Sequence, residues 1–340
     1  MDKDLKNMTF GEIEQLVTSL DQQRYLAKYI FSFIHVKNIC EISQISPLSK
    51  AFRNRLTEDG FHISHLATAD VLKDPDGTVK YIFNLPDGGR IETVLLSDGE
   101  RKTLCVSTQA GCAMGCAFCA TAKIRFNRNL TAAEIADQVN IVQEDGGRIS
   151  NVVYMGMGEP LANYDSVLRS VRILNHPEGK NIGIRHITVS TAGLPDGIGR
   201  LADEDIYPRL AISLNAPTDA IRNKLMPINS KYPIAKLLAA VDLYCRKTAN
   251  RVTFEYVLIK GVNDTVLHAK LLAKLLRGRM CNVNLIEFNP HEGCSFTAAG
   301  MEAIKRCASV LNTAGIETTV RAKMGRSIKA ACGQLGSGGG

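Results

Sequence analysis

Hydrophobic positions near the start of the chain recur with the period of an α-helix. Between residues 24 and 34, apolar side chains such as Leu26 and Ile30 lie three or four positions apart, which is the spacing of one helix face. Residues 49–57 predict a second, shorter helix with basic outer positions. We therefore expect residues 1–75 to form a small helical accessory domain.

The pattern changes to period two over residues 78–106. Val79, Tyr81 and Phe83 alternate with other positions before a turn of sequence PDGG at residues 86–89, and apolar positions resume after it. Alternation around such a turn is typical of a β-hairpin. We expect a hairpin extension over residues 76–102.

From residue 103 onward, apolar segments alternate with amphipathic stretches. The predicted strands span residues 103–107, 151–155, 186–190, 209–214, 253–259, 282–288 and 317–321. The clearest helix follows Thr131, because Thr131 and Glu134 have the spacing of a capping box. Repeated β–α units indicate an α/β fold with a parallel sheet, open or closed into a barrel, whose site lies at the carboxyl ends of the strands. This core is expected to span residues 103–335, followed by a flexible tail at 336–340.

Composition limits the class of protein. Of 340 residues, 45% are hydrophobic and 22% charged, as in ordinary globular proteins. No apolar run reaches the ~18–20 residues that a membrane span needs, and the polar N-terminus fits neither a secretory nor a transit peptide. A cytoplasmic location is therefore expected, where ten cysteines favour metal or redox chemistry over disulfides. The net charge of +7 is a weak indication of a polyanionic partner.

Three cysteines occur close together directly after the first predicted core strand. Cys112, Cys116 and Cys119 form the pattern Cys-x3-Cys-x2-Cys. Three thiolates can each bind one iron of a 4Fe-4S cluster and leave the fourth iron open for a ligand. The alternatives are a zinc site or ordinary buried thiols, but structural zinc takes four ligands and no fourth cysteine or histidine follows nearby. The spacing predicts an open iron–sulfur cluster.

A glycine-rich turn with one carboxylate ends the second core strand. Residues 154–163 read YMGMGEPLAN, where the glycines permit close approach of a ligand and Glu159 can accept a ligand ammonium group. Without the cysteine cluster, the same stretch would be interpreted as a plain strand-to-helix turn. Ser190, Ser213 and Asn289 end or follow other strands, where each is individually more typical of a strand-end hydrogen bond than of a ligand contact.

The cysteine motif is the signature of the radical SAM superfamily, which the chain resembles from about residue 103 to 335. With the ending AACGQL at residues 330–335, nearly the whole chain resembles the dual-specificity methyltransferases that modify carbon 2 of adenine in 23S ribosomal RNA and transfer RNA. The resemblance implies a partial (β/α) barrel, a 4Fe-4S cluster, and S-adenosylmethionine (SAM) that binds the open iron and is cleaved to a 5′-deoxyadenosyl radical. We expect a monomer that acts on 23S rRNA, tRNA or both, takes electrons from a donor such as flavodoxin, and does not involve a membrane.

The resemblance also implies which residues bind SAM and which carry the chemistry. The implied SAM contacts are Gly158, Glu159, Ser190, Ser213, Leu214, Asn215 and Asn289. Cys332 is the methyl carrier: one SAM methylates its thiolate, a second SAM yields the radical that activates the S-methyl group, and the resulting methylene radical adds to carbon 2. Cys105 corresponds to the resolving cysteine that captures the Cys332 sulfur as a transient disulfide. Glu92 corresponds to the proton acceptor.

Four positions depart from the family pattern. Ser327 stands where an acidic residue is usual, Ala122 and Arg125 stand where glycines are common, and Asn215 replaces a histidine beside the SAM site. No cluster ligand or catalytic cysteine is lost. The departures therefore bear on RNA contacts, target choice and details of SAM binding more than on the chemistry.

Three other functions compete with carbon-2 methylation. Carbon-8 adenosine methyltransferases of the antibiotic-resistance type tend to carry alanine after the Gly-Glu pair, where this chain has Pro160. A methylthiotransferase needs a second cluster, for which the N-terminal region has no cysteine set. An RNA-binding ribosome-assembly protein with a vestigial cluster is expected to lack Cys332 or Cys105, and both are present.

Overall fold

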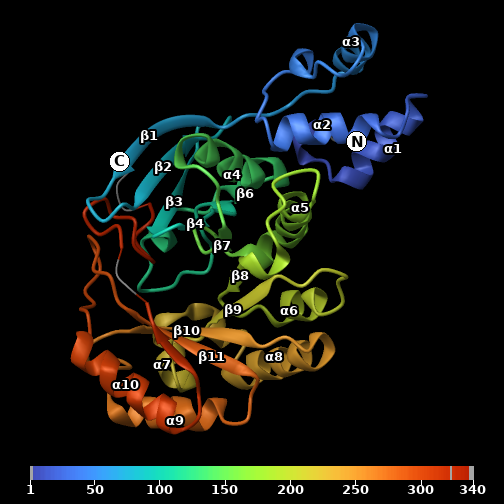
Figure 1. Ribbon diagram of the computed structural model, residues 1–340. Helices are drawn as coiled ribbons and strands as arrows, with labels where there is room; N and C mark the ends of the chain where they lie inside the picture. Colours follow the sequence, from blue (N-terminus) through green and yellow to red (C-terminus); the bar gives the residue numbers. More distant parts are fainter. Residues whose placement is uncertain (1–2, 322–323, 337–340) are drawn as a thin grey trace.

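The N-terminal region forms the helical unit that the sequence predicts. The structure is a computed structural model that describes residues 3–321 and 324–336. It begins with η1 (Leu5–Asn7), α1 (Phe10–Ser19), α2 (Leu26–His35), η2 (Ile42–Gln44) and α3 (Lys50–Glu58), where η denotes a short 3-10 helix. Thr9 and Glu12 form a capping box that starts α1, and Ser49 caps α3. This unit lies at one end of the molecule, beside α4 and α5 (Figure 1).

Residues 67–73 contradict the expectation of a wholly helical region up to residue 75. They form strand β1 (Ala67–Lys73), which pairs antiparallel with β2 (Val79–Asn84). The predicted hairpin is present as β2 and β3 (Arg90–Asp98), and β3 in turn pairs antiparallel with β4 (Arg101–Cys105). The hairpin therefore continues the core sheet rather than standing apart from it.

The seven predicted core strands are confirmed and run parallel. They are β4, β7 (Asn151–Tyr154), β8 (Ile187–Thr191), β9 (Arg209–Ser213), β10 (Val252–Leu258), β11 (Cys281–Glu287) and β12 (Thr318–Val320). The full sheet has the order β1-β2-β3-β4-β7-β8-β9-β10-β11-β12, so consecutive core strands are neighbours throughout. Such an order places the carboxyl ends of all seven core strands along one rim.

The parallel sheet curves into the predicted partial barrel. Thr103 and Cys105 of β4 and Thr319 and Val320 of β12 line one cavity, although five strands separate β4 from β12 in the sheet. The strands of the two ends therefore face each other across the open side of the barrel.

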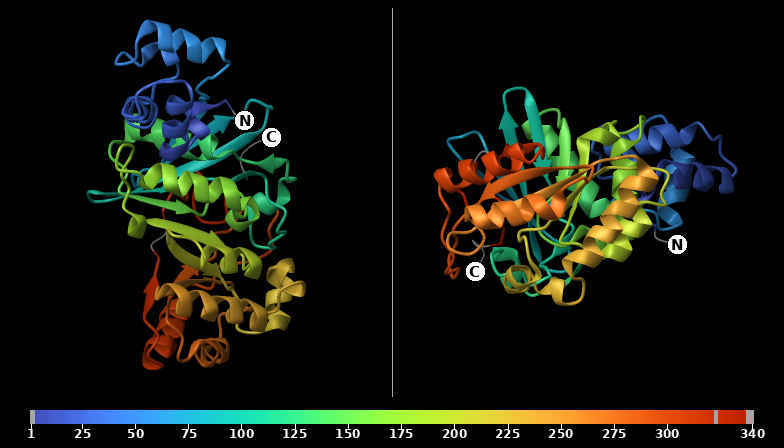
Figure 2. Two further views of the ribbon diagram at one scale, coloured as in Figure 1. Left: turned by 90° about the vertical axis from the view of Figure 1, so that its right-hand side faces the viewer. Right: turned by 90° about the horizontal axis from the view of Figure 1, so that it is seen from below.

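Helices connect the parallel strands and cover the outer face of the sheet (Figures 1 and 2). They are α4 (Ala132–Gly146), α5 (Tyr164–Asn175), α6 (Pro195–Leu201), α7 (Asp219–Leu225), α8 (Ile234–Thr248), α9 (Val266–Leu276) and α10 (Met301–Thr313). The predicted capping box of Thr131 and Glu134 starts α4, whose first eleven residues are all buried because α4 also contacts η1 of the helical unit. Within the described residues, no helix is long and apolar enough to cross a membrane.

A buried ion pair joins the helical unit to α4. Lys6 Nζ lies 2.5 Å from Asp137 Oδ1, and both side chains are almost fully inaccessible to solvent. The other carboxylate oxygen of Asp137 accepts a hydrogen bond from the backbone N–H of Leu66 (2.7 Å) and lies 3.4 Å from His65 Nδ1. His35 of α2 is buried in the same region, where burial lowers its pKa to about 3.

Candidate active site

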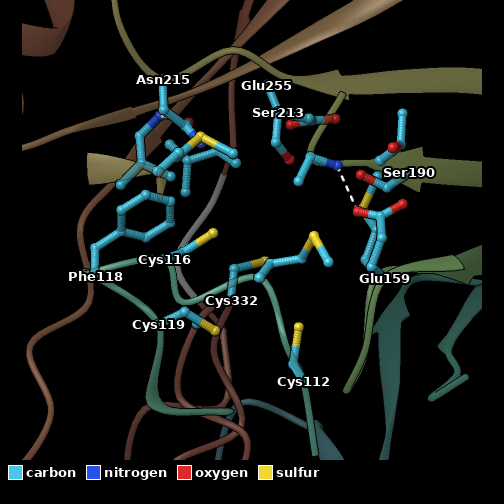
Figure 3. Close-up of a pocket in the computed structure, with 18 of the residues that line it drawn as sticks. Cys112, Cys116, Phe118, Cys119, Glu159, Ser190, Ser213, Asn215, Glu255 and Cys332 are labelled. Carbon is cyan, nitrogen blue, oxygen red and sulfur yellow. Dashed lines mark hydrogen bonds between the residues drawn. The ribbon is translucent and has the colours of Figure 1, made fainter. Parts of the chain in front are cut away.

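Two cavities open at the rim formed by the carboxyl ends of the core strands, and they share a wall. The first is lined by the cysteine loop and by residues at the ends of β7 to β10 (Figure 3). The second is lined by residues of β3, β4, β11 and β12 and by residues 330–333. The residues that line both cavities are Cys119, Met155, Gly156, Ile286, Glu287, Arg321, Cys332 and Gly333. Cys332 therefore faces two adjoining spaces.

The cysteine loop follows β5 (Gln109–Ala110) and precedes η3 (Ala120–Lys123) and β6 (Arg128–Asn129). It turns at Gly111, where φ is +79° and an added Cβ would lie 2.4 Å from the carbonyl oxygen of Arg125. Only glycine fits this approach. Arg125 and Ala122, which replace family glycines, are absent from the positive-φ residues, so their backbone conformations do not require glycine.

The three predicted cluster ligands face the first cavity together. Cys112, Cys116 and Cys119 all line it. Burial raises the pKa of the Cys112 thiol to about 11, and burial followed by the neighbouring Cys119 and Cys112 raises the pKa of Cys116 above its usual range. No three His, Cys, Asp or Glu side chains of the described residues are arranged to hold a single metal ion. Three thiols around a common space fit a 4Fe-4S cluster, in which each thiolate binds a different iron and the iron charge offsets the cost of ionising a buried thiol.

Glu159 lies opposite the cysteine loop, on the turn after β7 (Figure 3). One carboxylate oxygen accepts a hydrogen bond from the backbone N–H of Ala192 (2.6 Å), and the other accepts from that of Leu161 (3.0 Å). Pro160 is the first residue of η4 (Pro160–Asn163), where the lack of an N–H costs nothing. Burial raises the pKa of Glu159, and a ligand ammonium group in the cavity would compensate its charge.

Gly158 packs directly against the first residue of β5. Its φ is +103°, and an added Cβ would lie 2.6 Å from the Cβ of Gln109. Gln109 also accepts a hydrogen bond from the backbone N–H of Glu159 through its side-chain oxygen, at 2.8 Å. The glycine is therefore required for the close packing that aims Glu159 into the cavity.

The remaining predicted SAM contacts separate into three groups. Ser190 and Ser213 line the first cavity beside Glu159. Asn215 also lines it, with a left-handed φ of +56° that asparagine tolerates, but its side-chain oxygen accepts from the N–H of Val257 (2.9 Å). Leu214 is fully buried in the hydrophobic core and does not line either cavity, so its side chain is not placed to contact a ligand there.

Asn289 lines the second cavity instead of the first. Its side-chain N–H donates to the carbonyl oxygen of Cys332 at 3.2 Å, while its buried side-chain oxygen has no hydrogen-bond partner among the described residues. Asn289 therefore holds the backbone of Cys332 and presents an unsatisfied acceptor next to it.

The two catalytic cysteines predicted from the resemblance lie in the same region. Cys105 ends β4 and lines the second cavity with Cys332. Burial, and secondarily the neighbouring Cys332, raise the pKa of Cys105 to about 12. All ten cysteines are free thiols, including both members of this predicted disulfide.

Glu92 does not line either cavity. It is buried on β3, where one carboxylate oxygen lies 3.4 Å from Lys80 Nζ and accepts from the backbone N–H of Gly336 at 3.0 Å. Residues of a strand alternate between faces, so Glu92 shares its face with Val94, which does line the second cavity. Glu92 thus lies next to the second cavity, with its carboxylate in an ion pair with Lys80.

Cys332 lies on a segment that is fastened along its length, which we call the strap (residues 324–336). At one end, the N–H of Gly325 donates to Asp76, and the N–H and hydroxyl of Ser327 both donate to Asp74 Oδ2 (2.9 and 2.6 Å). At the other end, Gly336 is held by Glu92, so this first residue of the predicted flexible tail is anchored; residues 337–340 lie outside the described part of the chain. Ser327, which replaces an acidic residue that is usual in the family, thus donates to the carboxylate of Asp74, whereas an acidic side chain at this position would be repelled by it.

The sequence did not identify the pair of charged residues at the shared wall. Glu255 of β10 lines the first cavity, and Arg321, directly after β12, lines both. Their side chains form an ion pair at 3.1 Å, with Glu255 only 6% exposed. An acidic residue inside the otherwise apolar strand 253–259 was the available signal, because a buried carboxylate without a partner is costly.

Comparisons with known proteins agree with this arrangement. Residues 3–60 match the ribosomal RNA large subunit methyltransferase N-terminal domain, and residues 106–271 match the radical SAM superfamily.

Relatives match over almost the full length. A protein named "Probable dual-specificity RNA methyltransferase RlmN" from Thermoanaerobacter sp. (strain X514) is 44% identical over 332 residues, 97% of each chain, and one of the same name from Thermotoga maritima is 45% identical over 336 residues, 98% of this chain and 97% of the relative. The crystal structure of a radical SAM methyltransferase from Sphaerobacter thermophilus superimposes with a TM-score of 0.92 at 43% identity, covering 99% of this chain and 100% of that one. Because these matches include both the helical unit and the cysteine-bearing core, the chain belongs to the dual-specificity RNA methyltransferase family of the radical SAM superfamily.

Proposed function

We propose that this enzyme adds a methyl group to carbon 2 of an adenosine in 23S rRNA, in tRNA or in both, with Cys332 as the methyl carrier. The observation that carries the proposal is the position of Cys332 on the wall between two cavities. One cavity contains the three cluster cysteines and Glu159, and the other contains Cys105. A carrier must meet a methyl donor on one side and an acceptor on the other, and this residue has access to both.

The chemistry explains why an ordinary methyltransferase site is insufficient. Carbon 2 of adenine is an electron-poor amidine carbon, so it does not attack an electrophilic methyl group. A 4Fe-4S cluster with SAM on its open iron supplies, when bound, the one-electron chemistry that produces a 5′-deoxyadenosyl radical, and two SAM molecules are consumed per turnover. Cys112, Cys116 and Cys119 would hold the cluster, and Glu159, Gly158, Ser190 and Ser213 would orient SAM.

The two cysteines divide the remaining work in this proposal. The Cys332 thiolate accepts a methyl group, giving a thioether on the strap, and later joins carbon 2 of the base through that same carbon. Cys105 faces the second cavity, where it helps to remove the carbon-2 proton, which Glu92 accepts, and then attacks the Cys332 sulfur as a thiolate. This attack breaks the bond between the Cys332 sulfur and the transferred carbon, which takes up a proton to complete the methyl group on the base. It leaves a Cys105–Cys332 disulfide, which a thiol reductant must reopen.

Two further expectations stay within the proposal. Glu92 is the family's proton acceptor, and for it to act in this chain its contacts with Lys80 and Gly336 must open. The target adenosine must be unstacked to enter the second cavity, which costs a few kcal/mol unless it lies in a loop that is already open. We also propose a cytoplasmic, monomeric enzyme with a flavodoxin-type electron donor.

Nucleoside mass spectrometry tests the proposal. Reconstituted enzyme, reductant and methyl-deuterated SAM are incubated anaerobically with unmodified 23S rRNA or tRNA. Labelled 2-methyladenosine is expected with the wild type and with Cys40→Ala, a control at an exposed cysteine away from the site, and not with Cys332→Ala. Labelled 8-methyladenosine would assign the enzyme to the carbon-8 class, and no labelled adenosine in either RNA would refute the substrate.

A further inference from the structure

Arg321 lines cavities that Cys332 and Cys105 also line, a position that strand pairing alone does not explain. Its guanidinium lies between the two cavities and is 31% exposed. Two of its nitrogens lie 3.7 Å from the sulfur of Met155, and one lies 3.1 Å from Glu255. Cys332 lines the same two cavities as Arg321. Although burial lowers the pKa of Arg321, the nearby Glu255, Cys332 and Cys105 raise it by more.

Arg321 is held in this position from the neighbouring strands. Glu255 and Asn284 are paired across β10 and β11, and the Asn284 side chain donates to Glu255 Oε1 at 3.0 Å. The same oxygen accepts from Arg321, so one carboxylate oxygen fixes both side chains. A guanidinium group is planar and always charged. Because one of its nitrogens is held by Glu255, the directions of its other N–H donors are also fixed.

The carboxylate that holds Arg321 also faces the first cavity. Glu255 Oε2 is buried and has no hydrogen-bond partner among residues 3–321 and 324–336. Glu255 is paired with Ser213 of β9, one of the predicted SAM contacts. A buried carboxylate that leaves one oxygen unsatisfied is costly for folding, which points to a role in the site rather than in stability.

We infer that Arg321 is the positioning residue shared by the two catalytic cysteines, with Glu255 as its anchor. Its guanidinium provides the positive charge next to whichever sulfur is ionised, the Cys332 thiolate when it accepts the methyl group and the Cys105 thiolate when it resolves the adduct. A cation next to a thiol favours the thiolate, and a charge-assisted hydrogen bond also fixes its direction. The identification of these two sulfurs as catalytic rests on the proposed function, but the contacts of Arg321 do not.

Thiol alkylation tests the inference without requiring turnover. Full-length protein with its cluster reconstituted, which shields the three ligand thiols, is treated anaerobically with iodoacetamide at a single pH, and peptide mass spectrometry follows Cys332. The exposed Cys40 in the same molecule serves as the internal reference for reagent and time. Arg321→Met is expected to slow alkylation of Cys332 about tenfold relative to Cys40. Arg321→Lys, which keeps the charge but loses the fork, should recover part of the rate, and Glu255→Gln should cause a smaller fall.

The matched control is Arg251→Met, which removes a surface ion pair with Glu317 at the opposite ends of the same strands. It should leave the Cys332 rate unchanged. Melting temperature and the cluster absorption spectrum establish that each variant is folded. Alkylation of Cys332 at the wild-type rate in folded Arg321→Met would overturn the inference. Failure of the wild type to label RNA, with the alkylation difference intact, would instead overturn the proposed function alone.

Discussion

Two ion pairs with a buried carboxylate differ in how completely that carboxylate is hydrogen-bonded. In the joint between the helical unit and α4, both oxygens of Asp137 have partners, which are Lys6 on one side and Leu66 with His65 on the other. In the pair between the cavities, Glu255 shares one oxygen between two donors, and its other oxygen has no partner within the described residues.

The difference separates a structural contact from a functional one. Taking two charges out of water is costly, and full hydrogen bonding is what makes a buried pair tolerable. The carboxylate of the pair in the joint meets that condition, so we expect this pair to fix the helical unit on the core. The pair between the cavities does not meet it, and incompletely satisfied ionisable groups concentrate at sites that bind or react.

The largest effect of a single substitution on stability is expected at the ion pair between Lys6 and Asp137. Lys6→Met leaves the buried carboxylate of Asp137 without its cation and should lower the free energy of unfolding by about 3–5 kcal/mol. Urea denaturation measures this loss. Replacing both partners, in Lys6→Met with Asp137→Leu, should restore most of it because no unpaired charge remains. Equal stability of the single variant and the wild type would contradict the comparison.

The ion pair between Glu255 and Arg321 should contribute much less to stability. Glu255→Gln removes a charge that the protein only partly compensates, so the lost ion pair and the relieved desolvation should nearly cancel, within about 1 kcal/mol in the same urea experiment. The variant should nonetheless be impaired in Cys332 reactivity. If Glu255→Gln destabilises the fold as much as Lys6→Met does, the distinction between the two pairs fails.

The joint should also be sensitive to acid through His35. Its folded pKa of about 3 lies below the ordinary 6.5, so the unfolded chain takes up the proton first. The contribution of neutral His35 is therefore complete above pH 6.5 and is lost by about 1.4 kcal/mol per pH unit as the pH falls towards 3. Urea midpoints measured at several pH values should show this slope in the wild type. His35→Leu should flatten it, and substitution of the exposed His186 by glutamine should not.

The smallest effect should appear where the strap meets the β1–β2 turn. Asp74→Asn weakens the acceptor of the two Ser327 hydrogen bonds and should speed deuterium exchange in residues 324–331. The hydrogen bond from Ser327 is the main reason why the pKa of Asp74 is lowered. The contact between Asp74 and Ser327 should therefore persist above the ordinary pKa of 3.8 and be lost as the pH falls through the lower pKa of the folded state. Asp70→Asn, at an exposed site on β1, is the control. Unchanged exchange in Asp74→Asn would mean that the turn does not hold the strap.

The parallel strands and the cysteine loop could be predicted because their signals are local. Buried parallel strands are nearly continuous apolar runs, and three thiols at fixed spacing need no knowledge of the fold. Strand β1 could not be predicted in this way, since its residues are mostly exposed and its conformation is set by pairing with β2. Burial patterns carry little information for such an edge strand.

The functional pair at the shared wall required the tertiary structure. Glu255 and Arg321 are 66 residues apart, and only the curvature of the sheet brings β12 close to Cys105 of β4. The resemblance assigns Leu214 to the SAM site together with Ser213 and Asn215, but the side chain of Leu214 is buried in the hydrophobic core, because side chains near a strand end point in different directions. The placement of Glu92 in an ion pair was likewise set by Lys80 on the adjacent strand.

The fastening of the strap has a kinetic consequence. Since Gly325 is hydrogen-bonded to Asp76 and Gly336 to Glu92, the strap between them is short and keeps Cys332 near Cys105. Two thiols confined in this way meet as intramolecular partners, and short tethers give effective concentrations in the millimolar range or above. A soluble thiol must then compete with Cys105, which is always close to Cys332. Formation of the Cys105–Cys332 disulfide therefore depends on the length of the strap as well as on the reactivity of the two thiols.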